Sequence, residues 1–159
     1  GLEDRLDALH QLYRSQGRAH ILRTDASAIR ARGGKIVTAA QLGADFRGVI
    51  KGGRFVALEA KRLSGARRLP WSRIPPCQRT DLDVTLRMGG VALLFVELDG
   101  VDYLVPWQVA LASAGQASIP IVVPHRDGHV SGVVPAVCVP RLVMSDWLKT
   151  IEAAAAAGG

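Results

Sequence analysis

The residues best suited to metal and phosphate chemistry stand on one expected β-hairpin near the middle of the chain. The runs Phe46–Ile50 and Phe55–Lys61 have strand composition and flank the pair Gly52-Gly53, which is typical of a tight hairpin turn. Asp45 stands directly before the first run. The second run ends in Glu-Ala-Lys, so it carries an acid and a base two positions apart.

Side-chain alternation along the second run decides which of these groups meet. Successive side chains point to opposite faces of a strand, so Glu59 and Lys61 share one face, and the hairpin brings Asp45 towards Glu59. Mg²⁺ prefers carboxylate oxygens, and a neighbouring lysine can orient a water molecule or stabilise charge on a phosphate. The pattern therefore indicates metal-dependent phosphodiester hydrolysis.

A plainer interpretation fits the same residues. A glutamate and a lysine can lie together on a solvated strand face, and Asp45 would then be an ordinary residue at a strand start. The hairpin and its surroundings leave these two interpretations about even. The sequence contains no nucleophile elbow, P-loop or dinucleotide-binding fingerprint, which disfavours other catalytic classes.

Length and composition favour one globular domain. The chain has 159 residues, of which 48% are hydrophobic, so we expect a single domain over residues 1–152 and a low-complexity tail over 153–159. The two cysteines, Cys77 and Cys138, have no metal-binding spacing, which argues against a zinc site or a disulfide framework. No apolar run reaches the roughly 18–20 residues of a membrane span and no secretory signal pattern is present, so we expect a cytoplasmic protein without a membrane partner.

Positive charge is concentrated in and just after the hairpin. The whole chain has a net charge of +6 and a pI near 10.0. Residues 47–87 contain ten basic and three acidic residues, a net charge of +7, whereas the rest of the chain has a net charge of −1. Such clustering is expected of a protein that binds a phosphate backbone.

The remaining patterns place helices and strands on both sides of the hairpin. Their order is helix, strand, strand, strand, helix, strand, strand, helix, which predicts an α/β domain with a mixed central β-sheet flanked by helices. The run 91–98 is almost continuously apolar and predicts a buried central strand. The expected helices are 2–16, 74–88, 106–114 and 141–155, and the other expected strands are 19–23, 102–106 and 119–123.

Two further polar residues could join the site, and one segment could form an arm. Glu3 lies in the first turn of the first helix, where an acid also interacts favourably with the helix dipole. Gln78 lies in the first turn of the helix after the hairpin, where it could face the hairpin or be an ordinary helix residue. Residues 24–43 are irregular and basic, which fits a second hairpin or protruding arm as well as a solvated loop.

In combination, these stretches resemble the PD-(D/E)XK nuclease superfamily, and more closely RecU-type Holliday junction resolvases. The resemblance covers most of residues 1–150 and implies a restriction-endonuclease-like fold. The matching stretches are Leu2-Glu3-Asp4, Tyr13-Arg14, Gly17, Asp45-Phe46, Gly48-Val49, Lys51-Gly52, Glu59-Ala60-Lys61, Gln78 and Pro140-Arg141-Leu142.

The resemblance implies a role for each residue of the site. Lys61 would be the catalytic lysine and Gln78 the supporting glutamine on the following helix. Mg²⁺ would be the cofactor, and we expect Mn²⁺ to substitute for it. The metal-binding residues would be Asp45, Glu59, Ala60 and Glu3.

The resemblance also implies a DNA partner and an oligomeric state. A homodimer would bind a four-way junction and resolve it by paired symmetric nicks in a bacterial or phage-infected bacterial cytoplasm, with a stalk at about residues 25–43. The alternatives are a nuclease of the same superfamily acting on duplex or flap DNA, and a non-catalytic DNA-binding scaffold. The expected phosphate contacts are Arg30, Arg32, Lys35, Arg62, Arg67, Arg68 and Arg73.

Overall fold

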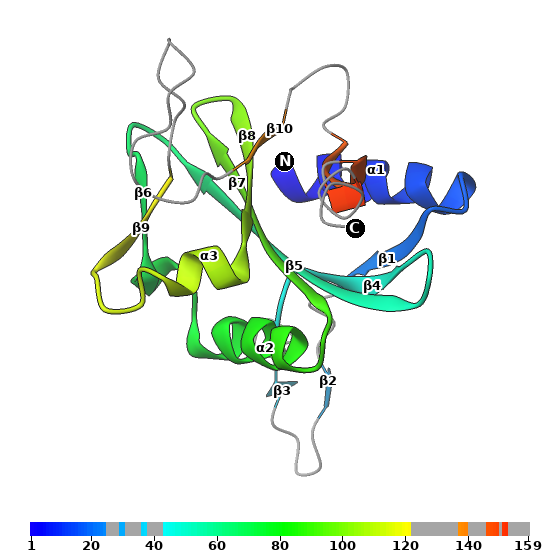
Figure 1. Cartoon of the computed structure of the whole chain (residues 1–159), viewed down its shortest axis with the longest axis horizontal. Helices are drawn as coiled ribbons and strands as arrows, with labels where there is room; N and C mark the ends of the chain where they lie inside the picture. Colours follow the sequence, from blue (N-terminus) through cyan, green and yellow to red (C-terminus); the bar gives the residue numbers. More distant parts are fainter. Residues whose placement is uncertain are drawn as a thin grey trace.

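The computed structural model describes residues 1–24, 29–30, 36–37, 43–121, 137–139, 146–149 and 151–152, and only the backbone of 29–30, 36–37 and 137–139. A helix at the start of the described chain is followed by a run of strands, and the later helices lie among the remaining strands (Figure 1). The elements are α1 (Leu2–Ser15), β1 (Ala19–Arg23), β2 (Ile29–Arg30), β3 (Ile36–Val37), β4 (Phe46–Ile50), β5 (Arg54–Leu63), β6 (Arg68–Pro70), the 3-10 helix η2 (Trp71–Arg73), α2 (Pro76–Arg87), β7 (Val91–Leu98), β8 (Val101–Pro106), α3 (Trp107–Leu111), β9 (Ser118–Pro120) and β10 (Val137–Val139).

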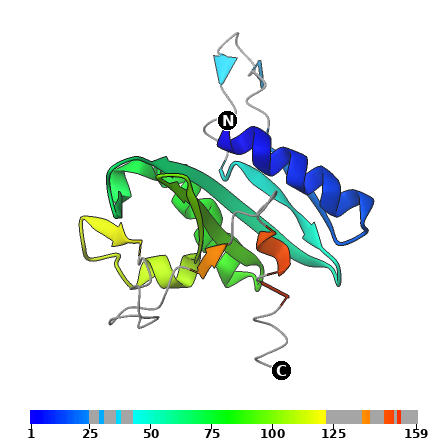
Figure 2. The ribbon, with the colours of Figure 1, turned by 90° about the horizontal axis from the view of Figure 1, so that it is seen from above.

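A six-stranded mixed sheet forms the centre of the molecule. Its strand order is β1-β4-β5-β7-β8-β10, in which β5 and β7 are parallel and the other neighbouring pairs are antiparallel. A parallel pair needs a crossover connection, and α2 lies within it. The view in Figure 2 shows the strands twisting across one another, as strands of L-residues do. The predicted α/β domain with a mixed central sheet is confirmed.

Each face of the sheet packs against different helices. On one face, Leu6 of α1 packs with Val56 and Leu58 of β5. On the other face, Leu82 of α2 packs with Ala57 of β5. Figures 1 and 2 show α1 on the opposite side of the sheet from α2 and α3. The strand β5 therefore turns its side chains alternately towards α1 and towards α2, as its sequence predicts.

The hairpin between β4 and β5 forms where the two glycines stand. Gly52 and Gly53 have φ values of +101° and +89°, a region that L-residues with side chains rarely adopt. The pairing begins at Ile50↔Arg54 and continues to Phe46↔Leu58. The turn fixes this register, and the register places Asp45 next to Glu59.

Most of the expected elements are confirmed, and one part of the fold was not foreseen. The strands β1, β4 and β7 have the expected bounds, and β7 is buried along its whole length. The segment after the hairpin, expected as a basic turn-rich stretch, contains β6 and η2. β6 pairs with β9 in a separate small sheet, so the strand expected at 119–123 does not extend the main sheet. Its partner lies about fifty positions away, too far for a local pattern to identify.

The end of the described chain packs on α1. The Trp147 indole Nε1 donates a hydrogen bond to His10 Nε2 at 3.1 Å, and the backbone N–H of Leu148 donates to the Tyr13 hydroxyl at 3.1 Å. Arg18 forms an ion pair with Asp146 at 3.0 Å. Residues 147–149 and 151–152 are helical, in agreement with part of the helix expected at 141–155.

Several sequence predictions fall on residues outside the described ranges. Within 25–43, only the antiparallel pair β2-β3 and Gly43 are described; the pair agrees with a second hairpin, and the stalk itself stays a prediction. The stretch 140–142 and the tail 153–159 also lie outside. Among the described helices, none has the length and apolar character that a membrane crossing requires.

Candidate active site

Asp45 and Glu59 meet at the start of β4, as the hairpin predicts. Asp45 directly precedes Phe46, which pairs with Leu58, and Glu59 follows Leu58 on β5. The backbone N–H of Asp45 donates to Glu59 Oε2 at 3.1 Å, and the backbone N–H of Ala60 donates to Asp45 Oδ2 at 3.0 Å. Each carboxylate thus accepts a backbone hydrogen bond from the segment that carries the other.

Lys61 and Gln78 complete a four-residue group on the α2 side of the sheet. The Lys61 Nζ lies 2.6 Å from Glu59 Oε1 in an ion pair and donates a hydrogen bond to Gln78 Oε1 at 3.1 Å. Gln78 reaches the lysine from the first turn of α2. The Glu59 side chain is fully buried, and 14% of the Lys61 side chain is exposed. The structure therefore brings together Asp45, Glu59, Lys61 and Gln78.

The electrostatics of this group disfavour a charged Glu59. Burial, followed by the nearby charge of Asp45, raises the pKa of Glu59 to about 8 from its ordinary 4.5, although Lys61 acts in the opposite direction. Among the described residues, the Lys61 ammonium is the charged group that contacts the buried Glu59 Oε1. One lysine does not balance two adjacent carboxylates.

These features fit a hard divalent cation. Mg²⁺ is commonly held by one or two carboxylates together with waters and substrate phosphate, and a cation here would offset the charge that burial penalises. The buried Glu59 carboxylate has Lys61 as its cationic partner, and Asp45 supplies a second carboxylate beside it. Among the described residues, no three or more His, Cys, Asp or Glu side chains are grouped to hold one metal ion.

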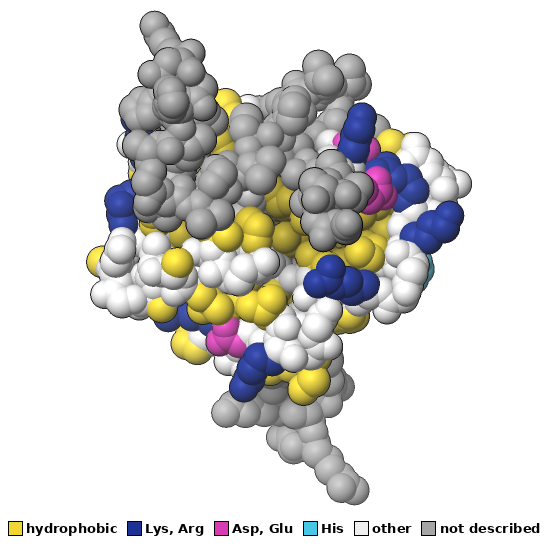
Figure 3. Space-filling view, viewed as in Figure 1, with side chains coloured by type: hydrophobic (Ala, Val, Ile, Leu, Met, Phe, Trp, Pro, Cys, Tyr) yellow, Lys and Arg dark blue, Asp and Glu magenta, His cyan; other side chains and the backbone are white. Residues whose placement is uncertain are grey.

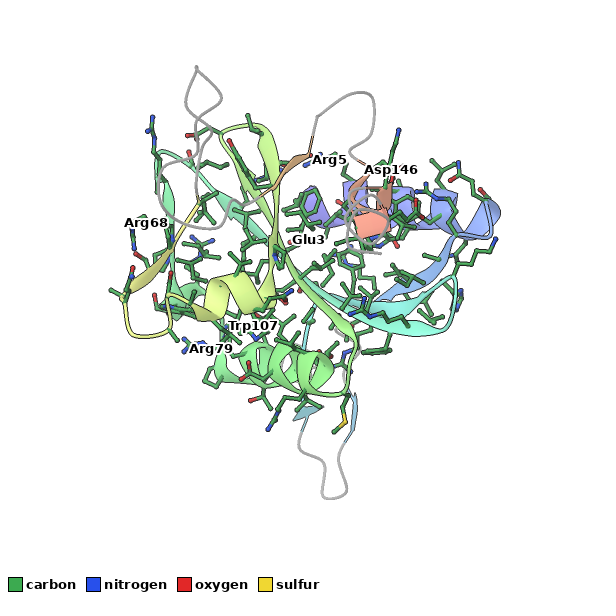
Figure 4. The ribbon with its side chains drawn as sticks, in the orientation of Figure 1. Glu3, Arg5, Arg68, Arg79, Trp107 and Asp146 are labelled. Carbon is green, nitrogen blue, oxygen red and sulfur yellow. The ribbon has the colours of Figure 1, made fainter. Side chains whose placement is uncertain are left out.

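Glu3 is not part of this group in the described structure. It lies in α1, which packs on the face of the sheet opposite to the one that carries Glu59 and Lys61. Figure 4 labels Glu3 and Arg5 near the start of α1 and Arg79 and Trp107 beside α2 and α3. The role of Glu3 as a metal ligand stays a prediction.

The basic residues expected to contact DNA differ in their surroundings. Arg62 forms an ion pair with Glu97 at 2.9 Å, and Arg68 donates to the Ser118 hydroxyl at 2.6 Å. Arg73 donates to the Arg62 carbonyl at 3.2 Å. Arg67 is exposed. All four are exposed residues, so each can reach a phosphate, but three of them already hold a protein partner.

The arm's basic residues cannot be placed. Arg32 and Lys35 lie outside the described residues, and the side chain of Arg30 is not described. On the face shown in Figure 3, some described Lys and Arg side chains gather at the upper right beside acidic side chains, and the others stand apart from them with hydrophobic and uncharged surface between.

Sequence reasoning missed a second buried acid pair. Glu97 of β7 pairs in register with Asp102 of β8, and Arg5 lies 2.7 Å from Glu97 while also binding Asp102 through two hydrogen bonds. Arg62 closes the cluster from β5. Arg5 belongs to the first helix and lies more than ninety positions from both acids. The Asp99-Gly100 turn in the sequence could have suggested the register of the two acids, but not their arginine partner.

Sequence comparisons find no match: no protein-family model fits the chain, and no curated protein is similar to it. Among solved structures, the chain is similar to Hjc, a Holliday junction resolvase from the archaeal hyperthermophile Archaeoglobus fulgidus. The two chains are 14% identical with a TM-score of 0.46, over 74% of this chain and 85% of that chain. A likeness of this degree leaves the function to be argued from the geometry of the site.

Proposed function

We propose that the protein is a Mg²⁺-dependent endonuclease of the PD-(D/E)XK type that resolves four-way DNA junctions. The observation that carries the proposal is the meeting of Asp45, Glu59 and Lys61 across one hairpin, with Gln78 bound to the lysine. Two carboxylates beside one lysine are suited to a cation, and the adjoining ammonium is suited to a phosphate. The proposal includes a RecU-like homodimer that makes paired nicks.

Each residue would perform one task in hydrolysis. A bound Mg²⁺ would supply Lewis-acid activation of the scissile phosphate. Asp45 and Glu59 would hold the ion from two neighbouring strands. The Lys61 ammonium would orient the attacking water and offset the negative charge that grows on the phosphate. Gln78, which accepts the hydrogen bond from Lys61 Nζ, would keep that ammonium from turning away.

The DNA partner would be held by arginines near the same end of β5. Arg62 follows Lys61 directly, and its side chain pairs with Glu97 on the opposite face of the sheet, whereas Arg73 of η2 binds the Arg62 carbonyl. Contacts of this kind fix the position of a phosphate backbone without reading sequence. A two-fold dimer would match the two-fold symmetry of a four-way junction.

A cleavage assay on two substrates tests the proposal. A labelled four-way junction and a duplex of the same sequence are incubated with the protein in Mg²⁺ and in excess chelator. We expect symmetric nicks in the junction only when Mg²⁺ is present. Asp45→Asn should reduce cleavage at least about 100-fold while junction binding survives, because a ligand of the ion is lost.

The control removes one negative charge elsewhere. Asp99 stands in the β7-β8 turn at a φ of +46°, a conformation that asparagine tolerates, so Asp99→Asn should cleave like the wild type. Equal cutting of the duplex would favour a general nuclease over a junction resolvase. Junction binding without any Mg²⁺-dependent nick would favour the non-catalytic scaffold, and full cleavage by Asp45→Asn would contradict the metal site.

A further inference from the structure

Asp81, on α2, binds the chain at the point where β4 begins. Its Oδ2 accepts a hydrogen bond from the backbone N–H of Ala44 at 2.8 Å, the residue before Asp45. The same oxygen accepts from Arg47 Nε at 3.0 Å and lies 2.8 Å from a terminal guanidinium nitrogen of Arg47. One carboxylate oxygen therefore joins α2 to the residues on both sides of Asp45 and Phe46.

Gly43 lets the chain come this close to Asp81. It has a φ of +128°, and a Cβ placed there would lie 2.5 Å from Asp81 Oδ2 and 1.9 Å from the Arg47 guanidinium. A side chain at this position would have to displace the ion pair. The close approach of the start of β4 to α2 thus depends on Gly43, Ala44 and Asp81.

The backbone of Asp45 is held from two other directions. Its N–H donates to Glu59 Oε2, and its carbonyl accepts from the backbone N–H of Thr24 at 2.7 Å. Asp81 supplies the third tie through Ala44. Three hydrogen bonds at and beside Asp45 restrict the position of its carboxylate. A metal ligand requires this restriction, because a misplacement of about 1 Å can lower the rate of catalysis by a large factor.

The helix α2 also binds Lys61, which lies on the other strand of the site. Gln78 and Asp81 are three residues apart, so they lie on one face of α2. Gln78 binds Lys61 on β5, and Asp81 binds Ala44 at the start of β4. The helix therefore fixes the two strands relative to each other where the four site residues meet.

We propose that Asp81 is a positioning residue that holds the Asp45 carboxylate in place for the metal ion. The inference rests on the proposed function for its purpose, but its structural claim can be tested without metal or DNA. Asp81 touches neither substrate nor the reacting atoms; it acts through Ala44. A hydrogen bond that only stabilises the fold would change the free energy of unfolding alone. A positioning hydrogen bond would also change the metal affinity of the neighbouring Asp45 carboxylate.

A second aspartate on the same helix provides a matched control. Asp83 accepts a hydrogen bond from the Trp107 indole Nε1 at 2.6 Å and so joins α2 to α3, away from Ala44. Asp81→Ala and Asp83→Ala each remove one partly buried acceptor. Both should lower the denaturant midpoint of unfolding, because each leaves a donor without its partner. Asp81→Asn keeps an oxygen for Ala44 and serves as the rescue variant.

Two measurements are made on the full-length wild type and the three variants. The first is amide hydrogen exchange without metal, followed at Ala44 and at Ala60, whose N–H donates to Asp45 Oδ2. The second is the dissociation constant of Mn²⁺, measured by calorimetry. Asp81→Ala should speed exchange at both amides and weaken Mn²⁺ binding about tenfold. Asp83→Ala should do neither, and Asp81→Asn should recover most of the loss.

The outcomes separate the inference from the proposed function. Unchanged exchange at Ala60 in Asp81→Ala, or a Mn²⁺ affinity equal to that of the wild type, would overturn the positioning role. Equal effects of Asp81→Ala and Asp83→Ala would also overturn it, because general loss of stability would then explain both. A wild type that binds no Mn²⁺ would overturn the proposed function, while faster exchange at Ala60 in Asp81→Ala alone would still support the positioning of Asp45.

Discussion

Two acid pairs on neighbouring segments of the sheet differ in charge balance. Glu97 and Asp102 face α1 and bind two arginines, Arg5 and Arg62. Asp45 and Glu59 face α2 and have one lysine between them and a neutral glutamine. The first pair is neutralised by the protein, and the second is not. An acid pair thus indicates a cation site only where the protein leaves its charge uncompensated.

The largest effect should come from breaking the balanced pair. Arg5→Met keeps most of the side-chain volume but leaves two buried carboxylates with Arg62 as their remaining arginine. Removing one partner of a buried ion pair typically costs about 3–5 kcal/mol. We expect a loss of this size in the free energy of unfolding, measured with denaturant at pH 7. A loss below about 1 kcal/mol would mean that the cluster is solvated and does not resemble a buried network.

The corresponding change at the other pair should act on catalysis instead. Lys61→Met should reduce the cleavage rate by about 100-fold or more, because the ammonium beside the phosphate is lost. The loss in unfolding free energy should be only about 1 kcal/mol, which corresponds to the hydrogen bond to Gln78. The loss of the ion pair adds little, because Glu59 can take up a proton and become neutral. Cleavage and denaturant unfolding are measured on the same preparation. A stability loss as large as that of Arg5→Met would contradict the comparison.

The buried imidazole of His10 extends the comparison to the pH dependence of stability. His10 is fully buried on the α1 face, and burial, together with nearby Arg14, lowers its pKa to about 4 from 6.5. A depressed pKa in the folded state means that this contribution to stability is present above pH 6.5 and is lost as the pH falls towards 4. The loss should be about 2 kcal/mol between pH 7 and pH 5.

The variant His10→Gln gives the reference for this prediction. Glutamine retains an acceptor for the Trp147 indole and does not titrate, so the difference in unfolding free energy between wild type and variant should shrink by about 2 kcal/mol over the same pH range. Denaturant unfolding at several pH values measures it. A difference independent of pH would show that His10 is not held neutral by its surroundings.

The sequence predicts contacts that depend on neighbouring strands and fails for contacts between distant elements. Asp45 and Glu59 could be placed together because a two-glycine turn fixes the register and side chains alternate along β5. Arg5 could not be linked to Asp102, and β6 could not be linked to β9, because no local period reports which distant surfaces pack. Asp81 was passed over for the same reason, although it lies three residues after Gln78.

Net charge also gave an incomplete prediction of the DNA surface. The excess of positive charge over residues 47–87 is real, but part of it is used inside the protein. Arg47 pairs with Asp81, Arg62 with Glu97, and Arg79 donates to the backbone carbonyls of η2 and the residue after it. Composition counts charges without showing their partners, so the number of arginines available to phosphate is smaller than the sequence suggests.

One binding measurement tests the contrast between the two acid pairs most directly. Mn²⁺ is titrated calorimetrically into the wild type, Glu59→Gln and Glu97→Gln, each confirmed to be folded. We predict that the wild type and Glu97→Gln bind the ion with similar affinity and that Glu59→Gln does not bind it measurably. Equal binding by the wild type and Glu59→Gln, or loss of binding in Glu97→Gln alone, would contradict the assignment of the cation to the Asp45–Glu59 pair.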